Sequence, residues 1–231
     1  MSIAVRLAEV HARIDAAARA AGRDPSSVRL VAVSKTFPLE AVREAYAAGQ
    51  RDFGENRVQE ALEKIGAAAD LDARWHLLGH LQTNKARKAA PAFAMIQSVD
   101  SVDLLRKLDA AAAESGRGPE LLVQVDLAGE ATKFGAPLEQ ARAIVRAAAG
   151  LQAARLVGLM TLPPFYDDPV AARPVFARLR AFRDELIAEG VPAAQLAELS
   201  MGMSHDFEVA IAEGATVVRV GSAIFGARTK P

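Results

Sequence analysis

The sequence contains no cysteine among its 231 residues and no excess charge, since 28 basic side chains are balanced by 28 acidic ones. The first absence excludes disulfides, thiolate metal ligands and cysteine nucleophiles. The second argues against the basic footprint of a protein that binds nucleic acid. Aromatic residues are few, at 5%, whereas apolar residues make up 51%, which is too many for a disordered chain. We therefore expect a globular protein with a full hydrophobic core.

Long apolar runs are missing as well. Every candidate stretch is broken by Arg, Glu or Gly before it reaches the roughly 18 residues of a membrane-spanning helix. The first 22 residues carry Arg6 and Glu9 inside their apolar pattern, which is unlike a secretory signal. Their apolar side chains instead recur at helical spacing and predict an amphipathic helix over residues 1–22. We expect a cytoplasmic protein that does not bind membranes.

After this helix, short apolar runs alternate with alanine-rich helical stretches. The runs are apolar on both faces, which is typical of buried parallel strands. About eight can be distinguished, and each except the last precedes a helical stretch: 28–34, 52–56, 75–80, 94–100, 120–128, 154–162, 197–203 and 215–226. Such alternation implies right-handed crossovers and a parallel sheet.

Eight strand–helix units in a chain of this length predict a closed (β/α)₈ barrel of the α/β class. An open, doubly wound sheet is the alternative, because a count of units does not distinguish closure from two free edges. The pattern contains no linker rich in Pro, Gly or Ser. We therefore predict one barrel domain over residues 1–231, with the N-terminal helix 1–22 packed on it.

Functional residues of a parallel barrel lie at the carboxyl ends of its strands. Lys35 directly follows the long apolar run 28–34. Its stem would be desolvated at the barrel rim, and desolvation disfavours the charged form of an amine. This environment suits a lysine that forms an imine with an aldehyde or ketone. A strand-end lysine that simply extends to water is the other interpretation.

Two turns rich in glycine and serine end the last two units, LSMGMS at 199–204 and RVGSA at 219–223. Gly202 and Gly221 allow close backbone approach, and N–H groups at helix starts favour an anion. Barrels often bind phosphate at this place, although such turns can also be purely structural. Together with an imine-forming lysine, the turns predict a phosphorylated carbonyl ligand. Pyridoxal 5′-phosphate (PLP) and a sugar phosphate both fit.

Five motifs follow one another along the chain: VAVSKTFPLEAVREAYAAGQRDFGENRVQE (31–60), WHLLGHLQTNK (75–85), GLMTL (158–162), LSMGMSHDFEVAI (199–211) and VRVGSAIFGAR (218–228). With them the sequence resembles the pyridoxal phosphate homeostasis proteins, which are related to the barrel domain of alanine racemase. The resemblance implies a fold-type-III barrel that carries PLP.

The resemblance also implies a set of residues that contact the cofactor. Lys35 would hold PLP as an internal aldimine, and Arg219 would face the pyridine nitrogen. The others would surround the phosphate (Ser200, Ser204, Gly221 and Ser222) or line the pocket (Asn56 and Met160). Where many relatives have threonine, Ser222 keeps the hydroxyl group. No spacing of His, Asp and Glu resembles a metal site.

An arginine beside the pyridine nitrogen has a chemical consequence. A guanidinium only donates hydrogen bonds, so the nitrogen must remain an unprotonated acceptor. Such a ring withdraws electrons weakly, which disfavours transamination. A racemase would need a second base, which in alanine racemase is a tyrosine from a second domain. We expect that domain to be absent, because the sequence stops at Pro231 just after the barrel.

We therefore predict a PLP-binding protein of intracellular PLP homeostasis, which stores or delivers the cofactor with at most weak racemase-like activity. The alternatives are a PLP-dependent amino-acid racemase and a Schiff-base aldolase that acts on a sugar phosphate. PLP-dependent apoenzymes would be the recipients, and we expect a monomer. Two residues stay open: Tyr166 could reach the barrel mouth, and His80 could touch a ligand or be purely structural.

Overall fold

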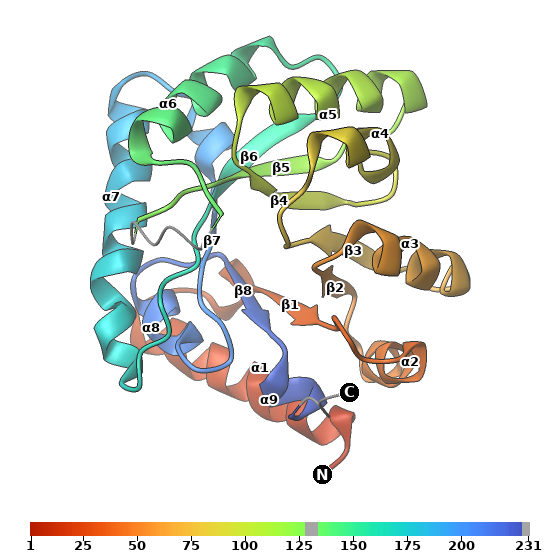
Figure 1. Ribbon diagram of the computed structural model, residues 1–231. Coiled ribbons are helices and arrows are strands. Elements are labelled where there is room, and N and C mark those ends of the chain that lie inside the picture. Colours follow the sequence, from red (N-terminus) through yellow and green to blue (C-terminus); the bar gives the residue numbers. More distant parts are fainter. Residues whose placement is uncertain (128–133, 228–231) are drawn as a thin grey trace.

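The computed structural model describes residues 1–127 and 134–227. Within them, eight parallel strands form a closed barrel in chain order (Figure 1). The strands are β1 (Arg29–Val33), β2 (Asp52–Glu55), β3 (Arg74–Leu77), β4 (Met95–Val99), β5 (Glu120–Gln124), β6 (Arg155–Met160), β7 (Glu198–Ser200) and β8 (Val217–Val220). Strand β1 pairs with both β2 and β8. This closure confirms the predicted barrel and excludes the open sheet.

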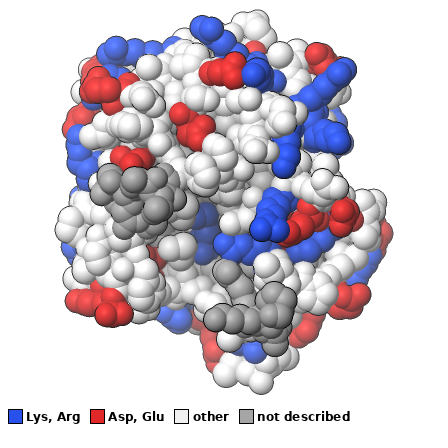
Figure 2. Space-filling view, viewed as in Figure 1, with Lys and Arg blue, Asp and Glu red and all other residues white. Residues whose placement is uncertain are grey.

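Helices surround the barrel (Figure 1). They are α1 (Ile3–Ala20), α2 (Leu39–Ala47), α3 (Val58–Ala67), α4 (Ala86–Ala89), α5 (Val102–Ser115), α6 (Leu138–Ala147), α7 (Arg173–Ala188), α8 (Phe207–Ala212) and α9 (Ser222–Phe225). In the described ranges, none of them has the length and apolar character needed to cross a membrane. Acidic and basic side chains are interspersed over the face shown in Figure 2, in line with the balanced charge of the sequence.

Helix α1 packs against α8 and α9, beside the closing strand (Figure 1). It begins after Ser2, whose hydroxyl accepts a hydrogen bond from the Val5 N–H at 3.3 Å. Its buried face includes Leu7 and Val10, and each large side chain buried in this way contributes about 1.5–3 kcal/mol. Arg6 Nε donates to the carbonyl oxygen of Ile224 at 2.5 Å, which ties α1 to α9.

The helical stretches differ from expectation beside the two glycine–serine turns. The helix expected over 204–213 begins only at Phe207, because residues 204–206 form a turn in which the Asp206 carboxylate accepts from the Met203 N–H at 2.6 Å. After the last strand, where no helix was expected, α9 forms. In both places, side-chain hydrogen bonds to the backbone decide the conformation, and these leave no periodic signal.

The barrel interior contains both apolar and polar side chains. Met95, Leu122, Val157 and Met160 form an apolar cluster that is separate from the larger core between barrel and helices. Beside it, Gln97 on β4 lies 3.6 Å from Met95 Sδ through its Nε2 and accepts a hydrogen bond from Ser200 on β7 at 2.6 Å. Because β4 and β7 are not neighbours in the barrel, this hydrogen bond must cross the interior. Buried polar groups therefore occupy part of a space that bulky branched residues usually fill.

Candidate functional site

A cavity of about 270 Å³ opens at the carboxyl end of the strands. Its polar lining consists of Lys35, Asn56, Ser204, His205, Arg219, Gly221 and Ser222. Its apolar lining consists of Val33, Leu78, Leu162, Phe165 and Met203. The structure thus brings the lysine that follows the first strand together with the turns that follow the last two.

The turn after β1 positions Lys35, whose half-buried side chain lines the cavity. Thr36 has a φ of 67°, in the left-handed region that a β-branched residue rarely adopts. Contacts with the neighbouring strand β2 and with helix α3 hold Ser34 in this turn. The Ser34 hydroxyl donates to Glu55 at 2.7 Å, and Lys64 Nζ donates to the Ser34 carbonyl oxygen at 2.8 Å. The strained turn is therefore fixed by its surroundings.

The turns after β7 and β8 meet at one hydroxyl group. Ser204 Oγ accepts hydrogen bonds from the N–H groups of Gly221 at 3.1 Å and Ala223 at 3.4 Å. A Cβ atom at Gly221 would lie 3.2 Å from the carbonyl oxygen of Val33. Gly202 has a φ of 92°, which favours glycine. The two turns therefore form one closely packed wall of backbone donors.

Arg219 lies beside this wall and is only 3% exposed. Its Nη1 donates to Ser200 Oγ at 2.6 Å, and its Nη2 donates to the carbonyl oxygen of Thr161 at 2.9 Å. Burial lowers the pKa of Arg219 to about 10, and the negative charge of Asp206 opposes that shift. The guanidinium therefore stays cationic at neutral pH, while its hydrogen bonds go to a hydroxyl and a carbonyl group.

Asp206 is the carboxyl group whose charge acts on Arg219. Burial raises the pKa of Asp206, and the hydrogen bond from the Met203 N–H together with the charges of Arg219 and His205 acts in the opposite direction. This carboxyl group holds the turn that carries Ser204, since it accepts from Met203 at the start of that turn.

Two residues of the predicted set do not line the cavity. Ser200 is fully buried in the barrel interior, where its hydroxyl accepts from Arg219 and donates to Gln97. Met160 is fully buried in the interior apolar cluster. Their roles toward phosphate and pocket stay predictions, because these two side chains lie under the site and not on its surface.

The two residues left open also lie outside the lining. His80 Nδ1 is 3.0 Å from Asp100 Oδ2, and its ring stacks on Phe134 with 4.0 Å between centroids. Tyr166 is half-buried and packs against the core. Neither His80 nor Tyr166 is among the residues that line the cavity.

Several lining residues were not singled out from the sequence. Leu162 ends the apolar run 154–162, Met203 lies in the turn 199–204 and Phe165 lies in a loop, and no pattern indicated that these side chains line the cavity. His205 follows Ser204, and its Nε2 lies 3.1 Å from the carbonyl oxygen of Asp167. Among the described residues, no group of three or more His, Asp or Glu could hold a metal ion.

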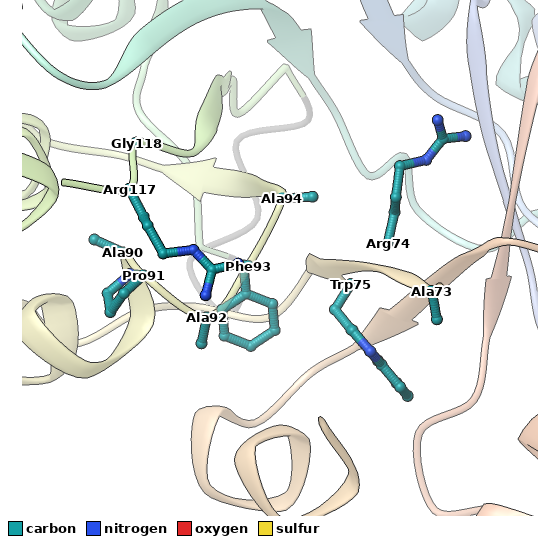
Figure 3. Close-up of a pocket in the computed structure, with 10 residues that line it drawn as sticks. All are labelled: Ala73, Arg74, Trp75, Ala90, Pro91, Ala92, Phe93, Ala94, Arg117 and Gly118. Atoms are coloured by element: carbon teal, nitrogen blue, oxygen red, sulfur yellow. The ribbon is translucent and has the colours of Figure 1, made fainter. Parts of the chain in front are cut away.

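A second cavity, of about 410 Å³, lies at the opposite end of the barrel (Figure 3). Residues just before or at the start of β3, β4 and β5 line it, among them Arg74, Phe93 and Arg117. Arg74 donates to both oxygens of Asp52, at 2.9 and 2.5 Å. This basal cavity is larger than the one at the mouth, but it lacks the buried cation and the backbone donors.

Comparison with known proteins places the chain in a family. The profile of the family described as alanine racemase, N-terminal domain, matches residues 5–229. The protein of Aquifex aeolicus named pyridoxal phosphate homeostasis protein is 42% identical over 228 residues, covering 99% of each chain. The protein of that name from Pseudomonas aeruginosa is 46% identical over 227 residues, covering 98% of this chain and 96% of the relative. The chain belongs to the pyridoxal phosphate homeostasis protein family.

Solved structures of other proteins were also compared with this member of the family. PipY of Synechococcus elongatus PCC7942, solved with PLP bound, has a TM-score of 0.86 and 46% identity, covering 97% of this chain and 100% of that one. The same protein without PLP gives a TM-score of 0.87. An alanine racemase from Clostridium difficile 630 has a TM-score of 0.74 at 17% identity, and 57% of its chain is covered. That last likeness shows the barrel fold alone.

Proposed function

We propose that this protein binds PLP in the cavity at the barrel mouth and serves PLP homeostasis in the cytoplasm, storing or delivering the cofactor without robust catalysis. One observation carries the proposal: Lys35, the wall at Gly221 and the buried cation of Arg219 line one cavity of about 270 Å³. Relatives with the homeostasis name and the PLP-bound structure of PipY support it.

Lys35 supplies the amine that such a ligand needs. The aldehyde of PLP condenses with a primary amine, which forms a carbon–nitrogen double bond and releases water. The turn after β1 restricts where this amine can lie, because the preceding residue, Ser34, is held by hydrogen bonds with Glu55 and Lys64. A fixed position lowers the entropy lost on binding.

The wall formed by the last two turns fits the phosphate group. The N–H groups of Gly221 and Ala223 converge on a single oxygen atom, that of Ser204. Ser222 adds a hydroxyl group to the same lining. Convergent backbone donors favour an anion. We assign the phosphate-binding role to these residues. We assign Asn56, which follows β2, to the lining of the same pocket.

Arg219 provides the donor for the ring nitrogen. Because the guanidinium is cationic and only donates, it would keep an adjoining pyridine nitrogen unprotonated, which weakens the ring as an electron sink. Of the lining groups described, His205 is the residue besides Lys35 that could accept a proton, and its Nε2 is 3.1 Å from the Asp167 carbonyl oxygen. This arrangement disfavours transamination, whereas binding or racemase-like proton exchange would be less affected.

The visible spectrum of the purified protein tests the proposal. After incubation with PLP we expect an imine absorption band, which borohydride converts into a stable adduct at Lys35 in the mass spectrum. Lys35→Ala should abolish both, whereas Lys107→Ala, which removes an exposed lysine paired with Asp103, should leave both intact. Persistence of the band and adduct in Lys35→Ala would refute the role of Lys35.

The same samples separate the alternative activities. A racemase would exchange the α-hydrogen of alanine or serine for deuterium, and Lys35→Ala would abolish the exchange. An aldolase would carry no chromophore, and borohydride would trap it only with a sugar phosphate. We expect exchange to be absent or very slow and trapping to depend on PLP. Rapid deuterium exchange would refute the storage function and would show that the protein is a racemase.

We also propose a monomer whose recipients are PLP-dependent apoenzymes. The chain covers nearly all of its homeostasis-protein relatives but 57% of the alanine racemase, so the remainder of the racemase has no counterpart in these residues. Light scattering tests the mass in solution. Mixing the loaded protein with an apoenzyme and measuring the recovered activity tests delivery, with PLP scavenged from solution as the control.

A further inference from the structure

A line of buried polar side chains runs through the barrel from the mouth toward the base. Arg219 Nη1 donates to Ser200 Oγ at 2.6 Å, and Ser200 Oγ donates to Gln97 Oε1 at 2.6 Å. Gln97 Nε2 is 3.2 Å from His76 Nδ1, and His76 Nε2 is 2.9 Å from Asp52 Oδ1. These five side chains are between 0% and 5% exposed. We call them the interior line.

The basal end of the interior line is a fixed negative charge. Burial raises the pKa of Asp52, but hydrogen bonds from His76 and Arg74, together with the charge of Arg74, outweigh it and hold the pKa at about 2. Asp52 is therefore ionised at neutral pH and can only accept hydrogen bonds. Arg74, which donates to Asp52 with two nitrogens, lines the basal cavity (Figure 3).

This charge sets the direction of every donor in the line. His76 must donate its Nε2 proton to Asp52, so in the neutral ring Nδ1 is an acceptor. Gln97 then turns its amide nitrogen toward His76 and its oxygen toward Ser200. Ser200 donates its single hydroxyl proton to that oxygen and accepts a hydrogen bond from Arg219. Each donor points from the mouth toward Asp52.

We infer that Ser200, Gln97 and His76 are positioning residues, which hold the guanidinium of Arg219 in one orientation and thereby set the electronic state of a ligand ring bound at the mouth. The inference rests on the proposed function, since it concerns PLP at Arg219. Ser200 can accept from Arg219 because its proton is already committed to Gln97. If Gln97 is removed, the serine hydroxyl can rotate and the guanidinium loses its directed partner.

The first test uses the protein without PLP. Nitrogen NMR of the imidazole groups should show the His76 proton on Nε2, with Nδ1 accepting a hydrogen bond. In Gln97→Leu, the Nδ1 resonance should shift, because the hydrogen bond from the amide is gone. A proton on Nδ1 in the unsubstituted protein, or no shift in the variant, would overturn the proposed direction of the line.

The second test uses the PLP-loaded protein and a matched pair of variants. Gln97→Leu breaks the interior line, whereas Gln124→Leu makes the same chemical change at another buried glutamine, whose Nε2 donates to the Phe134 carbonyl oxygen. Both variants should load PLP at Lys35, with dissociation constants within about threefold of the original. Only Gln97→Leu should shift the visible band and its pH titration, by about half a pH unit or more.

A further variant covers the case in which Gln97→Leu does not fold. Gln97→Glu keeps the shape and an oxygen toward Ser200 but removes the donor to His76, so it should also shift the titration. Titration curves of both variants that coincide with those of the Gln124→Leu protein would overturn the inference. Failure of the original protein to load PLP would instead refute the proposed function, and the NMR result would still decide the direction of the line.

Discussion

The two ends of the barrel carry their charges in different ways. At the amino end, charged side chains of the strands are joined in ion pairs: Arg29 with Glu198 at 3.3 Å, Arg74 with Asp52 at 2.5 Å, and Arg155 with Glu120 at 2.5 Å. At the carboxyl end, the buried Arg219 bonds to a hydroxyl and a carbonyl group and faces a cavity. Glu55 and Lys64 form an ion pair at 2.7 Å at the carboxyl end as well, so the difference lies in the buried cation that faces the cavity there.

This contrast shows why cavity size is a poor guide to function here. The basal cavity, at about 410 Å³, is larger than the cavity of about 270 Å³ at the mouth. A buried cation costs free energy even where a carboxylate such as Asp206 acts on it, so a fold that serves only stability gains little by keeping one. The residues at the mouth therefore point to ligand binding, and those at the base point to stability, as is general in such barrels.

The largest effect on stability should come from the base. Asp52→Ala removes the acceptor for His76 and Arg74, and we expect it to lower the free energy of unfolding by about 3 kcal/mol. Urea denaturation measures the change. As a control, Arg155→Ala removes a side chain that is 73% exposed and should cost less than about 1 kcal/mol. Equal losses in the two variants would contradict the contrast.

Acid should weaken the same end of the barrel. The pKa of Asp52 is depressed to about 2 in the folded protein, so its contribution is complete above the unfolded value near 4 and disappears as the pH falls toward 2. The expected loss over that window is about 2 kcal/mol. Urea midpoints measured across this pH range test it. Asp52→Asn should flatten that part of the curve, and an unchanged slope would count against Asp52.

At the mouth, the effect should fall mainly on binding. Ser204→Ala leaves the N–H groups of Gly221 and Ala223 without their oxygen partner, and PLP affinity should fall by about tenfold. Fluorescence titration with PLP measures it. Ser101→Ala is the matched control, because Ser101 caps α5 and does not line the cavity. That change should cost about 1 kcal/mol of stability and leave affinity unaltered.

Much of the architecture could be predicted because burial imposes periodic patterns. Apolar runs and helical stretches gave the order of the elements, and Lys35 was conspicuous as a lysine at the end of such a run. Arg219 lies on β8, and Gly221 directly follows the end of that strand. The structure places both at the cavity.

The remainder depends on contacts between distant residues. Ser200 bonds to Gln97, which is 103 positions away, and no local pattern announces such a pair. Met160 ends β6, beside a pairing with β5 that shifts register between Leu121 and Leu122, so counting along the sequence does not fix its surroundings. Phe165 lies in a loop and lines the cavity because the tertiary fold brings that loop to the barrel mouth, which no local sequence pattern indicates.

The hydrogen bond from Arg6 to Ile224 and the pairing of β1 with β8 join the first part of the chain to the last. During translation, β1 therefore leaves the ribosome long before the strand that completes its hydrogen bonding exists. The nascent protein must keep this exposed edge from pairing with other chains until β8 has been made. A ligand that bridges Lys35 and Gly221 would find its complete site only once β8 has closed the barrel, so filling of the site would report on closed barrels.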